Sequence, residues 1–225
     1  ICHAAAAVAL PAVLVCIRSA RIWVTPVAGA VPNLPAALAF AFLALAPLCL
    51  VLGGQFVAGA NIWRQAAPSV RTGSVQGWAY GWETSGFVVG GLLFNYFGAG
   101  RGEFLVAGLL GCIHAVAGWG VLAAGKEPSR LARAGLAALL CGSAALAVFS
   151  GRAGQATAAW RYPGQRLLES RQSIHGHLAV TAIGPQIHFH GNGLLLGAGD
   201  EPMAGETLAH YPMLWHPRPN RVLLI

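Results

Sequence analysis

The sequence predicts an α-helical multi-span membrane domain, then a small antiparallel β-domain, then the first strand of a further α/β domain. Three observations support this prediction. Hydrophobic residues make up 56% of the chain and charged residues 9%, whereas a soluble domain is about 25% charged. Charge-free stretches follow one another as far as residue 150, and short apolar runs alternate with turn sequences after it. The last residues, Val222–Ile225, form a continuous apolar run typical of a strand covered on both faces.

Residues 1–150 are predicted to be the membrane domain. A helix needs about 20 mostly apolar residues to cross a bilayer, and runs that do not alternate favour helices over a barrel. We expect five spans, at Ala4–Ile17, Ala36–Ala58, Gly77–Phe97, Phe104–Ala124 and Ala134–Phe149. The chain is therefore expected in the cell membrane as a multi-pass protein with the lipid bilayer as its partner. The C-terminal domain is expected on the cytoplasmic side, although the arginines divide between the two sides with little positive-inside bias.

The net charge of +7 does not indicate a nucleic-acid partner. The basic residues are scattered between apolar stretches, so they are interpreted as loop charges and interfacial anchors. The cysteines are widely spaced and form no CxxC pair, so we expect small buried hydrophobic residues and neither a metal site nor a disulfide. They are Cys2, Cys16, Cys49, Cys112 and Cys141.

The third expected span is rich in glycine and carries one acidic residue. The spacings Gly77-x-x-x-Gly81 and Gly86-x-x-x-Gly90 predict close helix packing in a bundle. A homo-oligomer is a separate expectation for the chain's partners. Glu83 lies in the same span, where a carboxylate indicates proton or substrate coupling. The alternative is a glutamate near the interface that is hydrogen-bonded to an aromatic neighbour or another helix.

Residues 151–220 are predicted to form the extramembrane β-domain. Three runs separated by Gly-Pro and Asn-Gly turns predict a meander, and they are His177–Ile183, Gln186–His190 and Leu194–Leu196. Leu167–Ser170 is a candidate strand before them, and residues 200–214 are predicted to form a short helix. The pairs His175/His177 and His188/His190 each fall on one strand face. No Cys, Asp or Glu stands near them at ligand spacing, so no metal is predicted.

Several stretches of the chain share the order and spacing of one known family. They are Glu169–Val180, Asn192-Gly193, Asp200-Glu201, Glu206, His210 and His216–Ile225. Together they resemble the N-terminal β-domain of spermidine synthases, the polyamine aminopropyltransferases. The apolar half resembles the multi-span domain fused ahead of such synthases, most clearly in Trp78–Glu83 and the glycines that follow. The resemblance covers most of the chain.

The resemblance implies that residues 221–225 begin a truncated Rossmann-like domain, whose Gly-rich turn would hold decarboxylated S-adenosylmethionine as co-substrate. The family reaction is aminopropyl transfer to a small amine. The catalytic carboxylates lie after the first Rossmann strand, so no catalytic, cofactor-binding or metal residue is assigned here, and the chain alone is expected to be inactive. Four residues are candidates for substrate binding at the pocket mouth: Asp200, Glu201, Glu206 and His210. The acidic ones are equally explained as charges favoured at a helix N-terminus.

The chain departs from the family pattern at positions that bind substrate. The substrate-binding glutamine falls on Gly176, the Tyr-His pair falls on Ala204-Gly205, and the aspartate before the hairpin glycine is Asn192. A second hypothesis therefore stands beside the first: a membrane transport or sensing protein with a degenerate, non-catalytic synthase-like tail.

Overall fold

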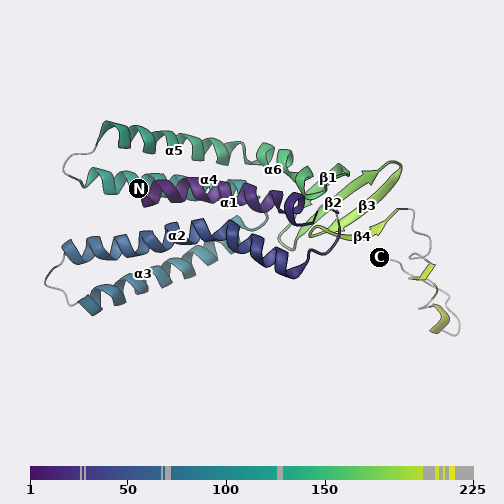
Figure 1. The fold of residues 1–225 in the computed structure, drawn as a ribbon, viewed down its shortest axis with the longest axis horizontal. Coiled ribbons are helices and arrows are strands. Elements are labelled where there is room, and N and C mark those ends of the chain that lie inside the picture. The colour runs from purple at the N-terminus through teal and green to yellow at the C-terminus, as the bar shows by residue number, and fades with distance from the viewer. Residues whose placement is uncertain are drawn as a thin grey trace.

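The computed structural model describes residues 1–25, 27, 29–66, 68, 72–125, 129–199, 206–207, 210 and 213–215. Within these residues, long helices lie side by side and a small sheet is attached to one end of the bundle (Figure 1). The helices are α1 (Cys2–Val24), α2 (Leu34–Ala66), α3 (Thr72–Leu93), α4 (Glu103–Ala123) and α5 (Arg130–Val148). Predicted spans and long helices thus coincide in order.

Four of the described helices are long and apolar enough to cross a membrane: α1, α2, α4 and α5. The prediction of five spans is therefore corrected at α3, which continues into a π-helical turn at Phe94–Gly98. Helix α3 contains Gln76, Glu83 and several Gly, Ser and Thr residues, which lower its hydropathy. Glu83 is exposed, and among the described residues neither Trp78 nor Tyr80 bonds to it.

Close helix packing occurs at α4 and α5, not at the glycines of α3. A methyl group built on Gly108 would lie 2.6 Å from the backbone nitrogen of Ala147, and one on Gly111 would lie 2.5 Å from Ser143 Oγ. By contrast, a methyl group on Gly81 or on any of the α3 glycines between Gly77 and Gly91 would meet no atom within 4 Å. The prediction of tight packing for the third span is therefore wrong for contacts inside this chain.

The cysteine prediction also needs correction. All five cysteines are free, but Cys49 and Cys141 are exposed and the others are only partly covered. Cys49 on α2 and Cys141 on α5 are exposed on their helices, where a lipid environment accepts a small apolar side chain as readily as a protein core does.

The helical region extends further along the chain than expected. Helix α6 (Ser150–Ala158) and the 3-10 turn η2 (Ala159–Arg161) follow α5 almost without interruption. The Ala-rich sequence Gln155–Trp160 favours helix over strand. The β-structure therefore begins at Arg166, not at the expected boundary of 151, and α6 links the bundle to the sheet (Figure 1).

The described strands form one antiparallel sheet in the order β1-β2-β3-β4. The predicted meander is confirmed at β2 (His177–Ile183), β3 (Gln186–Gly191) and β4 (Leu194–Ala198), and the candidate strand is β1 (Arg166–Gln172). Thr181 pairs with His188 and Ala179 with His190, so these buried side chains share the face toward η2. Leu178, Ile187 and Phe189 lie on the other face and are exposed.

The last part of the prediction lies outside the described residues. This holds for Val222–Ile225, the expected first strand of the Rossmann-like domain, and for Asp200 and Glu201. Within the expected helix at 200–214, the described residues Glu206, His210 and Met213 are helical and exposed.

Candidate functional site at the junction of bundle and sheet

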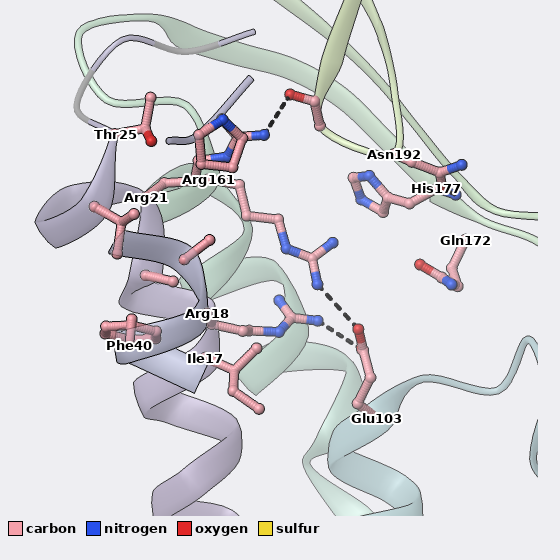
Figure 2. A pocket seen from close by; sticks show the side chains of 15 residues that line it. Ile17, Arg18, Arg21, Thr25, Phe40, Glu103, Arg161, Gln172, His177 and Asn192 are labelled. Atoms are coloured by element: carbon pink, nitrogen blue, oxygen red, sulfur yellow. Dashed lines mark hydrogen bonds and ion pairs between the residues drawn. The ribbon is translucent and has the colours of Figure 1, made fainter. Parts of the chain in front are cut away.

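An ion-pair network joins three helical elements where the bundle meets the sheet. Glu103, the first residue of α4, accepts from two arginines (Figure 2). Arg18 Nη2 of α1 lies 2.7 Å from Glu103 Oε2, and Arg161 Nη2 of η2 lies 3.0 Å from Glu103 Oε1. Because Glu103 stands in the first turn of its helix, the helix dipole also favours its negative charge.

Arg18 is the most deeply placed member of this network, at 7% exposed. Its Nη1 donates to the carbonyl oxygen of Gly154 at 3.1 Å and to Thr157 Oγ1 at 2.9 Å, so it fixes α1 against α6. The guanidinium also lies 5.0 Å from the centre of the Phe104 ring. A buried charge is tolerated only when paired and hydrogen-bonded. These contacts meet that condition for both Nη atoms, whereas the buried Nε has no partner among the described residues.

Arg21 ties the same helix to the sheet. Arg18 and Arg21 are three residues apart, which places them on one face of α1. Arg21 donates to the carbonyl oxygen of Ala30 at 2.5 Å and to that of Gly193, in the β3–β4 turn, at 3.1 Å. Beside this contact Gly29, at φ +84°, forms a parallel bridge with Leu194. The turn between β3 and β4 is thus held by the last turns of α1 and by the middle of the α1–α2 connection.

His177, at the start of β2, faces the network from the sheet. Its Nε2 is hydrogen-bonded to Ser170 Oγ at 2.8 Å, and its Nδ1 lies 3.5 Å from the hydroxyl of Tyr162. Burial lowers the pKa of His177 below its ordinary value of 6.5, and the nearby Arg161 guanidinium lowers that pKa further. The imidazole is therefore neutral near pH 7.

These residues line a cavity of about 440 Å³ between α1, the start of α2 and the sheet (Figure 2). Its described lining includes three arginines and one acid, Glu103, together with His177 and two amides. A neighbouring cavity of about 430 Å³ lies toward α6 and shares Arg18, Glu103 and His177. Volumes of about 300–1,000 Å³ with a few convergent polar groups are typical of ligand sites.

Two departures from the family pattern, Gly176 and Asn192, are in contact with each other. Asn192, at φ +52°, accepts from the backbone N–H of His177 through Oδ1 at 2.9 Å. Its own N–H donates to the carbonyl oxygen of His177 at 2.7 Å. A Cβ on Gly176 would lie 2.6 Å from Asn192 Oδ1. No side chain fits at position 176 while Asn192 keeps this rotamer.

A second polar cluster lies under the sheet and serves its core. His190, 1% exposed, packs on Tyr162 at 4.8 Å between ring centres, and its Nε2 lies 3.0 Å from Thr181 Oγ1. Thr181 Oγ1 donates in turn to Gln165 Oε1. Burial and the neighbouring His188 lower the pKa of His190. In the described part of the chain no group of three or more His, Cys, Asp or Glu side chains is placed to hold a metal ion.

The two predicted site residues that the structure describes are not part of the junction cavity. Glu206 and His210 are exposed and absent from its described lining, and Asp200 and Glu201 are not described. Among the residues that do form it, Arg18 and Arg161 belong to the basic residues interpreted as loop charges and interfacial anchors, and Glu103 was not singled out from the sequence. Their signal was position: each stands at the end of an apolar stretch on the side where the sheet follows.

Comparison with family models, with curated proteins and with solved structures found no match to this chain. The family resemblance therefore continues as a proposal.

Proposed function

We propose that this chain is the membrane anchor and small β-domain of an aminopropyltransferase that resembles spermidine synthases. The observation that carries the proposal is the antiparallel meander directly after the bundle. The stretch with the strongest resemblance, Glu169–Val180, spans the end of β1 and the start of β2, and Asn192-Gly193 forms the β3–β4 turn. These stretches lie on strands and turns of one small antiparallel sheet, which supports the proposal.

The exposed face of the sheet fits this proposal. Leu178, Ile187 and Phe189 are 60%, 40% and 47% exposed on one face, and contiguous apolar surface of this kind is typical of a docking face. In the proposal, a Rossmann-like domain that begins at Val222–Ile225 supplies the cover. That domain holds decarboxylated S-adenosylmethionine and the carboxylate that accepts the amine proton. The amine attacks the methylene carbon beside the sulfonium, and the thioether nucleoside leaves.

The contact between Gly176 and Asn192 informs the choice of acceptor. Where the family carries a glutamine and an aspartate, this chain has no side chain and a neutral amide, and the amide is already hydrogen-bonded to His177. The site therefore offers less negative charge to a polycation. We infer an acceptor amine that carries fewer positive charges than a polyamine.

The test uses membranes that contain the natural protein to which this chain belongs. They are supplied with decarboxylated S-adenosylmethionine and, in separate reactions, with a monoamine, putrescine or spermidine. Release of methylthioadenosine and a product heavier by one aminopropyl group, both followed by mass spectrometry, are the expected result, with the monoamine preferred. Folded, membrane-inserted protein that releases no methylthioadenosine with any amine would refute the proposal.

A second candidate function, transport or sensing, is favoured by one polar cluster inside the bundle. His3 Nδ1 of α1 lies 3.3 Å from His114 Nδ1 of α4 and 3.1 Å from Gln55 Nε2 of α2. Ionisable side chains between spans often mark ion or proton pathways. Proton flux into liposomes that contain the protein, lost in His114→Gln, would support this function over the first.

A further inference from the structure

The described lining of the junction cavity carries more positive than negative charge. Arg18, Arg21 and Arg161 face it with only Glu103 in opposition. His177 adds no charge near pH 7 because burial and Arg161 lower its pKa. The surplus is therefore two positive charges, from three guanidinium groups and one carboxylate. Cations removed from bulk water require an anionic partner, since desolvation of an unpaired charge is costly.

Hydrogen-bonding capacity also remains in the cavity. A guanidinium has five N–H donors, and Arg161 uses one nitrogen for Glu103 while its side chain is 23% exposed. Thr25 lines the same cavity, and its buried Oγ1 has no partner among the described residues. The amide of Gln172 lies opposite, on the sheet side (Figure 2). An anion with several oxygens would satisfy these donors together.

The cavity has an apolar wall on the side of the bundle. Ile17 of α1 and Phe40 of α2 form part of it, and both helices are apolar enough to cross a membrane. The charged wall combines Arg18 and Arg21 near the C-terminal end of α1, Glu103 at the start of α4, and Arg161 of η2. The sheet lies beyond these helix ends (Figure 1). This order, apolar along the helices and cationic at their ends, matches the order of acyl chain and headgroup in a lipid.

We propose that this cavity binds the phosphate of an anionic membrane phospholipid. The Arg161 and Arg21 guanidiniums and the Thr25 hydroxyl donate to the phosphate oxygens, and the first part of an acyl chain lies against Phe40. Guanidinium groups suit this role because their planar donor fork matches phosphate oxygens. The site is independent of any transferase activity, and it makes the sheet's attachment depend on lipid composition.

The test uses the full 225-residue chain purified in a neutral detergent. Short-chain phosphatidylglycerol, phosphatidylcholine and inorganic phosphate are added separately, and bound lipid is counted by native mass spectrometry alongside the thermal midpoint. We expect one retained phosphatidylglycerol and a raised midpoint, with neither effect from phosphatidylcholine. Inorganic phosphate at equal concentration leaves the midpoint unchanged because it lacks the apolar part.

Variants assign the binding to the cavity. Arg161→Gln is expected to weaken phosphatidylglycerol binding by about tenfold, since it removes one charge-assisted contact. Arg161→Lys keeps the charge but not the planar pair of donors, and its affinity for phosphatidylglycerol is expected to lie between those of the wild type and Arg161→Gln. The matched control is Arg152→Gln, which removes the same charge from α6 at the same end of the bundle but outside the lining, and it binds like the wild type. Thr25→Val leaves every ion pair intact and weakens binding by about threefold.

Three outcomes would overturn the proposal. The first is equal retention of phosphatidylcholine and phosphatidylglycerol, which would make the cavity indifferent to charge. The second is a loss of binding in Arg152→Gln as large as that in Arg161→Gln, which would indicate general surface attraction. The third is a midpoint raised as much by inorganic phosphate as by lipid, which would assign the cavity to a soluble anion. If Arg161→Gln does not fold, Thr25→Val decides, and wild-type affinity in it overturns the proposal.

Discussion

The substitution Glu103→Gln tests whether the junction is held by charge. Glutamine keeps the length and shape of the side chain and removes the negative charge shared by Arg18 and Arg161, at 2.7 and 3.0 Å. Arg18, 7% exposed, would then be left in a region from which water is largely excluded. The substitution would therefore weaken the attachment of α1 to α4 and η2, and with it the attachment of the sheet to the bundle.

The expected magnitude lies between two known limits. Breaking a buried pair by removing one partner costs about 3–5 kcal/mol, and an exposed pair contributes about 0–1 kcal/mol. Glu103 is 38% exposed while its main partner is buried, so solvent screening reduces the upper limit, and we expect about 2 kcal/mol. For a chain of this size, that corresponds to a thermal midpoint lower by about 4–8 °C.

The assay is thermal unfolding in detergent micelles, followed by the fluorescence of the tryptophans and by circular dichroism. The matched control is Glu169→Gln, which removes the same charge from the pair with Arg171, whose side chains are 59% and 82% exposed; its midpoint stays within about 2 °C of the wild type. The double variant with Arg161→Gln loses less than the sum of the singles because the two residues share one contact. A Glu103→Gln midpoint equal to that of Glu169→Gln would refute the role of charge at this junction.

Three further predictions concern the sheet and the bundle. Burial lowers the folded-state pKa of His190 below 6.5, so the unfolded chain binds more protons than the folded chain as the pH falls. The free energy of unfolding is therefore expected to decline below pH 6.5. Thermal unfolding midpoints at pH 7.5 and 5.5 measure this decline, and His190→Gln is expected to reduce it. Gly176→Ala places a Cβ 2.6 Å from Asn192 Oδ1 and is expected to lower the free energy of unfolding by about 1–3 kcal/mol. In an Asn192→Gly background the same substitution is expected to lower it by less, and an equal loss would contradict the contact. Gly108→Leu, at the α4–α5 contact, is expected to lower the yield of folded monomer because the larger side chain has no space there. Gly86→Leu on α3 is expected to leave that yield unchanged. The fraction of monomer after size-exclusion chromatography measures the yield of each variant.

Local patterns in the sequence predicted the elements well because each pattern reflects local physics. The absence of charge defined α1, α2, α4 and α5, and the Gly184-Pro185 and Asn192-Gly193 turns fixed the register of the sheet. What failed was packing between elements. The spacing of glycines in α3 is the same whether or not a neighbour is present, so it could not show that the close contacts lie at Gly108 and Gly111 of α4.

The junction site was missed for a related reason. Arg18, Glu103 and Arg161 are far apart in the sequence, and each is an ordinary charge at the end of an apolar stretch. Only the arrangement of α1 against α4, and of η2 at the end of α6, brings the three side chains to one point. Ion pairs between residues far apart in the sequence produce no periodic pattern. The sequence does show that these charges lie at the ends of apolar stretches on one side of the bundle.

The two faces of the sheet have different chemistry, and this difference constrains the molecule's function. The face toward η2 is filled by polar groups that bond to one another, among them Thr181 and His190, so it is a fixed attachment and not an open site. The opposite face is apolar and exposed at Ile187 and Phe189. A sheet that existed only to cap the bundle would place polar side chains there, since an isolated apolar face in water favours association. A sheet held on one side by these hydrogen bonds and apolar on the other is therefore suited to association with a further apolar surface.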